Sequence, residues 1–448
     1  MINGREAAFR GLGAYRRGKG FAEALIVASD EKSGISAVDA ALAAQILKGV
    51  VQNMAYCDYV VSCFSSLELK KLHPRVLDIL RISIYQILFL DKIPHSAVVD
   101  EGVKLAKKYS NPRAAGFVNA ILRKAAESAF RGSLPEVAGE NEYQRLALKY
   151  SHPEWLVREF CTLLGQDGAE ALLGINNSAN IPVTAQINTL RTDTETAISM
   201  LKSDGIEVIC HKWLSDCVEI LRPGRLERLV AFRKGCIYIQ DAASRMAVMA
   251  AEPKSGDLII DGCAAPGGKS FTAAIMIKGK GRIAAFDINE SKLKRVKDGA
   301  KRLGINIIEA IIKDSSVQDG GYVDRADVVF ADVPCSGLGV IHKKPDIRYK
   351  SESDIAGLPD VQRKILSNLS SYVKPGGTLI YSTCTILKRE NEDIIEDFLQ
   401  AHPEFETECF TLPGVEQATN GMTTLWPQIH KTDGFFICKM KRRDRFES

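Results

Sequence analysis

Short apolar runs alternate with helical segments from about Gly235 onward, and this alternation restricts the possible folds more than any other feature. The runs that we expect to be strands are residues 257–260, 282–286, 305–312, 328–331, 378–381 and 435–439. Each of the first five is followed by a helix or a long loop, the pattern of a parallel sheet with helices on both faces. We therefore predict a Rossmann-like α/β domain with a doubly wound, mostly parallel sheet over residues 236–448.

Two cysteines follow two of these predicted strands. Cys335 lies in the segment DVPCSG (332–337), and Cys384 lies in YSTCT (381–385). Ligands of open α/β sheets bind outside the carboxyl ends of the strands, so the two thiols could face one pocket. A thiolate is a strong nucleophile, which favours covalent catalysis. The alternative is that both are buried cysteines acting as small hydrophobic residues.

A loop of small residues, DGCAAPGGKS (261–270), follows the first of these strands. Small residues let a ligand approach the backbone and let a helix begin beneath it. The spacing from Gly262 to Gly268 is one residue too long for a phosphate-binding P-loop, and the dinucleotide glycine triplet is also missing. The loop is therefore either a nucleoside-binding loop or a structural tight turn.

Two acidic residues favour a nucleoside ligand. Asp287 ends the second predicted strand, where a carboxylate accepts hydrogen bonds from ribose hydroxyls in sheets of this kind. Asp314 follows the third predicted strand and could accept from an adenine amino group. Together with the loop they predict an adenosine-bearing ligand without a pyrophosphate, for which S-adenosylmethionine is the natural candidate.

The chain of 448 residues exceeds the usual size of one hydrophobic core, so two or three domains are expected. Helical spacing of apolar residues predicts an all-helical domain at 1–132, and mixed patterns predict a small α+β module, RRM-like or a linker, at 141–235. Residues 1–132 carry 19 Lys and Arg against 12 Asp and Glu, although the whole chain has a net charge of only +4. That excess indicates contact with nucleic acid or an ordinary basic surface.

The eleven cysteines, in a chain whose first residues show no signal-peptide core, predict reduced thiols in a cytosolic protein. The sequence has no Cys-x-x-Cys pair, so we expect no structural zinc and no other metal. Its apolar runs are too short to cross a membrane, so we expect no membrane partner. We expect the protein to be a monomer.

Three segments, DGCAAPGGK (261–269), DVPCSG (332–337) and STC (382–384), resemble the signatures of RNA 5-methylcytosine methyltransferases of the NOL/NOP2/Sun group. KPDIRY (344–349) and RENE (389–392) also fit that group. In the N-terminal third, IPHSAVVDE (93–101) and GFVNAILR (116–123) resemble the RNA-binding helical domain of the antiterminator NusB. The two domains together have the layout of bacterial enzymes that methylate 16S ribosomal RNA.

The resemblance implies an S-adenosylmethionine-dependent enzyme that methylates carbon 5 of one cytosine in small-subunit ribosomal RNA. It implies that Cys384 adds to carbon 6 as the nucleophile, that Cys335 assists product release, and that Asp332 holds the amino edge or nitrogen 3 of the ring. It also implies a cofactor site made of Cys263, Ala264, Ala265, Pro266, Gly267, Gly268, Lys269, Asp287, Asp314 and Asp332.

Two further expectations concern flanking positions. Thr385 stands where many members of the group carry serine after the nucleophile, and it keeps the hydroxyl. The basic residues Lys343, Lys344 and Arg348 are expected either to line the RNA path or to be solvated loop charges.

Three alternatives remain open from the sequence. The roles of the two thiols could be exchanged, because DNA methyltransferases of similar chemistry use the cysteine of the Pro-Cys segment. The same chemistry could act on transfer RNA or on another ribosomal site. The chain could also be a non-catalytic RNA-binding assembly or antitermination factor, although the set Asp287, Asp332, Cys335 and Cys384 argues against a dormant pocket.

Overall fold

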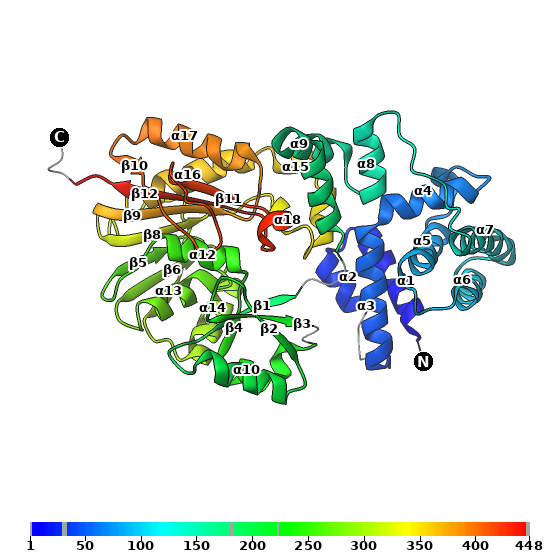
Figure 1. The fold of residues 1–448 in the computed structure, drawn as a ribbon, viewed down its shortest axis with the longest axis horizontal. Helices are drawn as coiled ribbons and strands as arrows, with labels where there is room; N and C mark the ends of the chain where they lie inside the picture. Colours follow the sequence, from blue (N-terminus) through cyan, green and yellow to red (C-terminus); the bar gives the residue numbers. More distant parts are fainter. Residues whose placement is uncertain (1, 29–33, 179–181, 222–223, 445–448) are drawn as a thin grey trace. The chain divides into compact units, whose positions relative to one another are not determined.

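The computed structural model describes residues 2–28, 34–178, 182–221 and 224–444 (Figure 1). The chain forms two compact units. Unit 1 contains residues 1–179 and the later segment 341–350, and unit 2 contains residues 180–340 and 351–448. The three-way division into 1–132, 141–235 and 236–448 stays a prediction.

Unit 1 is helical. The sequence predicted an all-helical domain over residues 1–132, whereas the helices at 142–150 and 154–176 also belong to unit 1 and lie in the range predicted for the α+β module. The helices of unit 1 are α1 (Gly4–Arg16), α2 (Phe21–Ala28), α3 (Ala37–Gln52), α4 (Met54–Phe64), η2 (Leu69–Lys71), α5 (Pro74–Phe89), α6 (His95–Tyr109), α7 (Pro112–Phe130), α8 (Glu142–Tyr150), α9 (Glu154–Asn176) and η5 (Pro345–Tyr349). The apolar faces of α1 to α7 pack on one core, which includes Leu47, Ile79 and Val118. Burial of these faces stabilises the bundle, because short helices are marginal on their own in water.

Two helix starts match the capping pattern of the sequence. Asn111 caps α7, and its side chain accepts a hydrogen bond from the backbone N–H of Ala114 at 2.9 Å. Pro112 and Pro74 occupy the first turns of α7 and α5, where a missing N–H costs nothing.

The segment 341–350 corrects one expectation from the sequence. Arg348 is neither solvated nor placed along an exposed RNA path, because its side chain is fully buried in unit 1. Its guanidinium donates to the carbonyl oxygens of Gln52 at 2.7 Å and Asn176 at 3.0 Å, and to Asn177 Oδ1 at 2.7 Å. Burial lowers the pKa of Arg348 to about 10. The sequence shows that residue 348 is charged. It does not show the carbonyl oxygens that accept hydrogen bonds from its buried guanidinium.

Unit 2 begins with a small antiparallel sheet in the order β2–β3–β1–β4. Its elements are β1 (Val183–Ile187), α10 (Thr194–Ser203), β2 (Glu207–Cys210), β3 (Cys217–Leu221), η3 (Leu226–Arg228), α11 (Val230–Arg233) and β4 (Ile237–Ile239). Alternate strand residues such as Ala185, Val218 and Ile237 pack against Leu201 of α10. This arrangement fits the predicted α+β module.

The rest of unit 2 is built on a larger sheet with the order β10–β12–β9–β8–β5–β6–β7, and β11 pairs with β12. The neighbouring pairs from β9 to β7 are parallel, while β12 is antiparallel to β9. Its elements are α12 (Ala242–Ala250), β5 (Leu258–Asp261), α13 (Gly268–Met276), β6 (Arg282–Asp287), α14 (Glu290–Leu303), β7 (Ile308–Ile312), β8 (Ala326–Asp332), η4 (Leu338–Val340), α15 (Glu352–Ile355), α16 (Leu358–Ser370), β9 (Val373–Thr383), η6 (Lys388–Glu390), α17 (Glu392–Ala401), β10 (Phe405–Thr407), β11 (Met422–Leu425), α18 (Pro427–His430) and β12 (Phe435–Arg442). The predicted doubly wound, mostly parallel sheet is confirmed.

Successive residues of the central strands face opposite helix layers. Ile259 and Val328 pack with α12, α13 and α14, whereas their neighbours Ile260 and Val329 pack with α16 and α17. Figure 1 shows α16 and α17 on one face of the sheet and α13 and α14 on the other. A strand that is buried on both faces has a continuous run of apolar residues, and this pattern allowed the strands to be predicted from the sequence.

Among the residues that the structure describes, none of the helices is long and apolar enough to cross a bilayer.

Candidate active site

Three of the predicted carboxylates lie along one edge of the larger sheet. Asp287 is the last residue of β6, Asp332 is the last residue of β8, and Asp314 follows the end of β7. These strands run parallel to β5, so their carboxyl ends point the same way. The structure therefore brings together the acidic positions that the sequence singled out.

The loop between β5 and α13 turns tightly against its surroundings. Gly267 has a φ of +112°, a conformation that favours glycine, and a Cβ there would lie 2.5 Å from the ring of Phe271. A Cβ on Gly262 would lie 2.3 Å from the side chain of Leu369. The N–H of Gly267 donates to the carbonyl of Ala264 at 2.7 Å, closing the turn before Gly268 begins α13. Both glycines are therefore required by the path of the loop.

At the start of this loop, Asp261 is buried and Cys263 is partly buried. Asp261 Oδ2 accepts a hydrogen bond from Ser270 Oγ at 2.6 Å, and burial raises the pKa of the Asp261 carboxyl to about 6. Burial also raises the pKa of the Cys263 thiol, and the nearby charges of Asp332, Asp261, Asp287 and Asp314 raise it further. The field of these carboxylates keeps Cys263 protonated, so its thiol lines the loop and is not a nucleophile.

The thiols of Cys335 and Cys384 lie side by side. Their sulfur atoms are 3.3 Å apart. Asp332 of β8 is paired in register with Ser382 of β9, so the loops that carry the two cysteines leave the sheet at the same level. This contact links the two predicted motifs directly.

The two thiols differ in acidity. The hydrogen bond with Cys335 lowers the pKa of Cys384, and the positive charge of Lys269 lowers it further. The same hydrogen bond, burial and the negative charge of Glu390 raise the pKa of Cys335. Either sulfur can donate this hydrogen bond, and the lowered pKa of Cys384 favours its ionisation over that of Cys335.

Lys269 and Asp332 form an ion pair beside the thiols. Lys269 Nζ is 2.7 Å from Asp332 Oδ2 and 3.0 Å from Ser244 Oγ. The other carboxylate oxygen of Asp332 accepts from Ser382 Oγ at 2.8 Å. Lys269 is only 7% exposed, so this charge is held by its partners rather than by bulk water. Ser382 lies in the STC segment (382–384) that the sequence singled out, although its contact with Asp332 could not be read there. Ser244 carries no signal in the sequence, because a serine in a helix is too common to single out.

Glu390 accepts hydrogen bonds from both of the loops that carry the cysteines. It is 1% exposed, and its Oε2 accepts from the backbone N–H of Ser336 at 2.9 Å and from Gln362 Nε2 at 2.9 Å. Its Oε1 accepts from the hydroxyl of Thr385, which lies 2.7 Å from Ser336 Oγ. Ser336 and Thr385 directly follow Cys335 and Cys384. The Thr385 hydroxyl therefore belongs to the hydrogen-bond network that connects the two loops. Glu390 itself lies in the segment RENE (389–392), which the sequence analysis had noted.

We expect Glu390→Ala to destabilise the protein by about 2–4 kcal/mol, because it removes the buried carboxylate that accepts from the Ser336 N–H and from the Gln362 amide. We expect methyl transfer to fall by about 10- to 100-fold as the two loops lose their common support. Thermal unfolding and initial rates measure the two effects. Glu396→Ala, at an exposed position of α17, is the matched control and should change neither. A Glu390→Ala protein as stable and active as wild type contradicts this role.

Three family models match separate parts of the chain. The model of 16S rRNA methyltransferase RsmB/F matches residues 248–441, the NusB family matches residues 2–127, and the RsmF/B-like ferredoxin-like domain matches residues 152–227. The resemblance stated from the sequence is confirmed by these matches. They also identify the fold of the small module, which the sequence had left as RRM-like or a linker.

Individual proteins resemble the chain over nearly its whole length. The probable ribosomal RNA small subunit methyltransferase B of Bacillus subtilis is 34% identical over 98% of this chain and 98% of its own length. The protein of that name in Synechocystis is 31% identical over 99% of this chain and 100% of its own. The crystal structure of a methyltransferase homologue from Pyrococcus horikoshii superposes with a TM-score of 0.57 at 25% identity, covering 68% of this chain and 100% of that one.

Proposed function

Because the chain belongs to the RsmB/F family of 16S rRNA methyltransferases, we propose that it transfers a methyl group from S-adenosylmethionine to carbon 5 of one cytosine in 16S ribosomal RNA. The observation that carries the proposal is the 3.3 Å separation of the Cys335 and Cys384 sulfurs beside Asp332. A methyltransferase that acts on an amino group or an oxygen needs no thiol pair. Two thiols in contact suit a reaction that makes and then breaks a bond to the ring.

The residues at the sheet edge fit S-adenosylmethionine, which supplies the methyl group when it is bound. Asp287 is partly exposed at the end of β6 and would accept from both ribose hydroxyls. Asp314 is exposed and would accept from the adenine amino group. The carboxylates around Cys263 give this edge a negative field that favours a sulfonium cation. The tight turn at Gly267 lets the ligand approach the backbone.

Cys384 is the proposed nucleophile. Carbon 5 of cytosine is a poor nucleophile until an anion adds to carbon 6 and turns the ring into an enamine. The lowered pKa of Cys384 means that a larger share of this thiol is ionised at a given pH than in an ordinary cysteine. The new bond joins Sγ to carbon 6, and the electron pair of the ring would then attack the methyl group from carbon 5, while the bond from the methyl group to the sulfonium sulfur breaks and its electron pair stays on that sulfur.

Asp332 is the proposed ring-holding group. Lys269 and Ser382 fix its two carboxylate oxygens at 2.7 Å and 2.8 Å. A carboxylate held in this way accepts a hydrogen bond from the amino edge of cytosine and presents carbon 6 to the thiolate. It also helps to bring a proton to nitrogen 3 as the thiolate adds.

Cys335 is the proposed release group. After methyl transfer, the proton on carbon 5 must leave to a base while the bond from carbon 6 to Cys384 breaks and returns the thiolate. Cys335 lies in contact with Cys384. Its thiol would first give its own proton to water, and the resulting thiolate would then take the proton from carbon 5.

Bisulfite sequencing tests the proposed substrate. In a strain that lacks this protein, we expect one cytosine of 16S ribosomal RNA to lose its protection from bisulfite, and a plasmid copy of the wild-type gene should restore it. A copy with Cys409→Ala, at an exposed cysteine outside the site, should restore it equally. A 16S map that does not change excludes this substrate. Loss of protection in transfer RNA or in another ribosomal RNA would support the alternative substrate with the same chemistry.

A further inference from the structure

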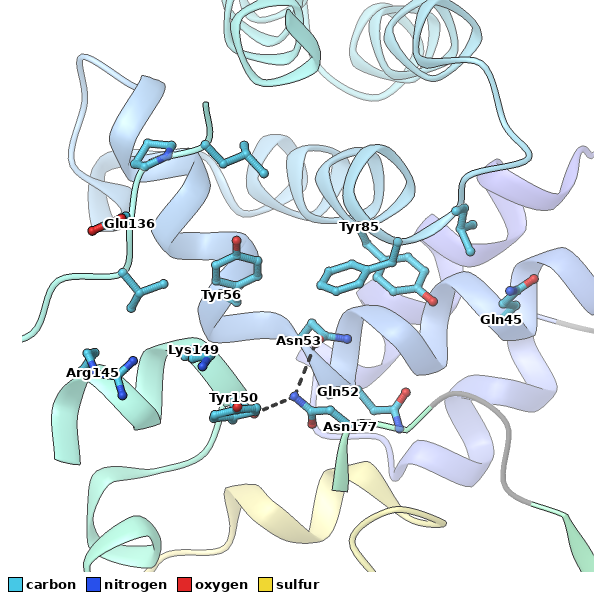
Figure 2. A pocket seen from close by; sticks show the side chains of 15 residues that line it. Gln45, Gln52, Asn53, Tyr56, Tyr85, Glu136, Arg145, Lys149, Tyr150 and Asn177 are labelled. Carbon is cyan, nitrogen blue, oxygen red and sulfur yellow. Dashed lines mark hydrogen bonds between the residues drawn. The ribbon is translucent and has the colours of Figure 1, made fainter. Parts of the chain in front are cut away.

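Unit 1 contains a cavity of about 690 Å³, a size typical of ligand sites. Figure 2 shows side chains from α3, α4, α5 and α8 and from the chain before α8 arranged around it. Its lining residues are Gln45, Gln52, Asn53, Tyr56, Tyr85, Phe89, Leu90, Leu134, Pro135, Glu136, Val137, Arg145, Lys149, Tyr150 and Asn177. None of them belongs to the methyl-transfer site described above.

One wall of the cavity is aromatic. The rings of Tyr85 and Phe89 stack at 5.3 Å, and Tyr56 meets Phe89 edge to face at 6.3 Å. Phe89 is 41% exposed although its neighbour Tyr85 is buried, so an aromatic face is open to a ligand. Burial raises the pKa of Tyr85 to about 12, which keeps its phenol neutral. An exposed ring at the mouth of a cavity is a stacking surface for another flat ring.

A second wall consists of carboxamides. Asn177 Nδ2 donates to the carbonyl of Tyr150 at 2.9 Å, and Asn53 Nδ2 donates to the carbonyl of Gly49 at 2.9 Å, so both amides have a fixed orientation. Gln52 is only 3% exposed, yet its Nε2 has no hydrogen-bond partner among the described residues. A buried amide N–H₂ without an acceptor costs free energy, and a ligand carbonyl or ring nitrogen would satisfy it.

The amide wall is held in place from behind. The buried guanidinium of Arg348 donates to the backbone carbonyl of Gln52 and to Asn177 Oδ1, each at 2.7 Å. Tyr349 Oη donates to the carbonyl of Val51 at 2.8 Å. These bonds fix the end of α3 that carries Gln52, so little conformational entropy is lost there when a ligand binds.

The rim carries two basic side chains one turn apart on α8. Arg145 pairs with Glu142, and Lys149 pairs with Glu170 at 2.8 Å. All four side chains are 31–42% exposed, and ion pairs of this kind contribute little to stability. A phosphate group could therefore take over one of these cations at little cost.

We propose that this cavity binds one unstacked nucleobase of the RNA substrate, with the base stacked on Phe89, an edge hydrogen-bonded to Gln52 Nε2, and its phosphate near Arg145 and Lys149. This inference rests on the proposed function, because it takes the ligand to be RNA. Sequence-selective RNA recognition uses unstacked bases, aromatic stacking and amide contacts of this kind. An apolar peptide would leave the Gln52 amide without an acceptor, and a small anion would leave the aromatic wall without a partner.

Substitutions at Phe89 test the stacking contact in the full-length protein. The probe is a 16S ribosomal RNA transcript, and Kd, KM and kcat are measured at one salt concentration. We expect Phe89→Leu to raise Kd and KM by about 5- to 100-fold and to leave kcat nearly unchanged. Phe89→Trp keeps a stacking ring, so it should bind like wild type, and the transcript should quench its added fluorescence. The matched controls are Phe130→Leu and Phe130→Trp, at a phenylalanine that is 85% exposed outside the cavity.

The outcomes distinguish a failure of the cavity assignment from a failure of the proposed function. The cavity is not a base site if Phe89→Leu has the same Kd and KM as Phe130→Leu and the fluorescence of Phe89→Trp is not quenched. If the wild-type protein still methylates the transcript in that case, the proposed function stands. If wild type binds through Phe89 but transfers no methyl group, the proposed function fails and the cavity assignment stands. A wild-type protein that neither binds nor methylates the transcript overturns both. Thermal unfolding confirms that the variants are folded.

Discussion

Cys384→Ala is expected to reduce methyl transfer to 16S ribosomal RNA by about 10⁴-fold or more, because removing the nucleophile of a covalent enzyme costs rates of that order. Binding of S-adenosylmethionine should stay nearly unchanged, since the loop at 261–269 and Asp287 are intact. Transfer of a radiolabelled methyl group and equilibrium dialysis of the cofactor measure the two quantities. Cys409→Ala controls for the loss of a thiol elsewhere, because Cys409 is exposed.

The pH dependence gives an independent check on this assignment. Because the pKa of Cys384 is lowered, its thiolate is present at lower pH than that of an ordinary cysteine, and kcat/KM should rise with pH and level off earlier than for an unperturbed thiol. Normal methylation by Cys384→Ala would show that another residue attacks the ring. A Cys384→Ala protein that also fails to bind the cofactor would point to a structural role.

Cys335→Ala is expected to trap the enzyme on its substrate. The adduct between Cys384 and carbon 6 still forms, but the group placed to assist elimination is lost, so a covalent protein–RNA complex should accumulate. Denaturing gels with labelled RNA and S-adenosylmethionine reveal it as a band of reduced mobility. Turnover should fall by about 10²- to 10⁴-fold, the usual contribution of one acid–base group.

A double variant and a pH profile complete this test. Cys335→Ala combined with Cys384→Ala should form no adduct, because the attacking sulfur is absent. In Cys335→Ala the ascending limb of adduct formation should move to higher pH, since the hydrogen bond that lowers the pKa of Cys384 is gone. An adduct that forms in Cys384→Ala but not in Cys335→Ala would show that the two roles are exchanged.

The parallel strands were readable from the sequence because both of their faces are buried and their runs are continuously apolar. The predicted run at 282–286 corresponds to the parallel strand β6 (Arg282–Asp287). The run at 435–439 was also predicted, and it corresponds to the antiparallel strand β12 (Phe435–Arg442). The strands β10 (Phe405–Thr407) and β11 (Met422–Leu425) were missed. They are short and pair only with β12, so they carry no long run of apolar residues.

The sequence alone determined that Asp287, Asp332, Cys335 and Cys384 would gather at one edge. Parallel strands end in the same direction, so residues placed just after them must meet there. It could not determine that the two sulfurs are 3.3 Å apart or that Glu390 ties their loops together. Nor could it show that Arg348 is buried behind Gln52. Contacts of this kind join residues far apart in the chain, and only the packing of whole elements against one another fixes them.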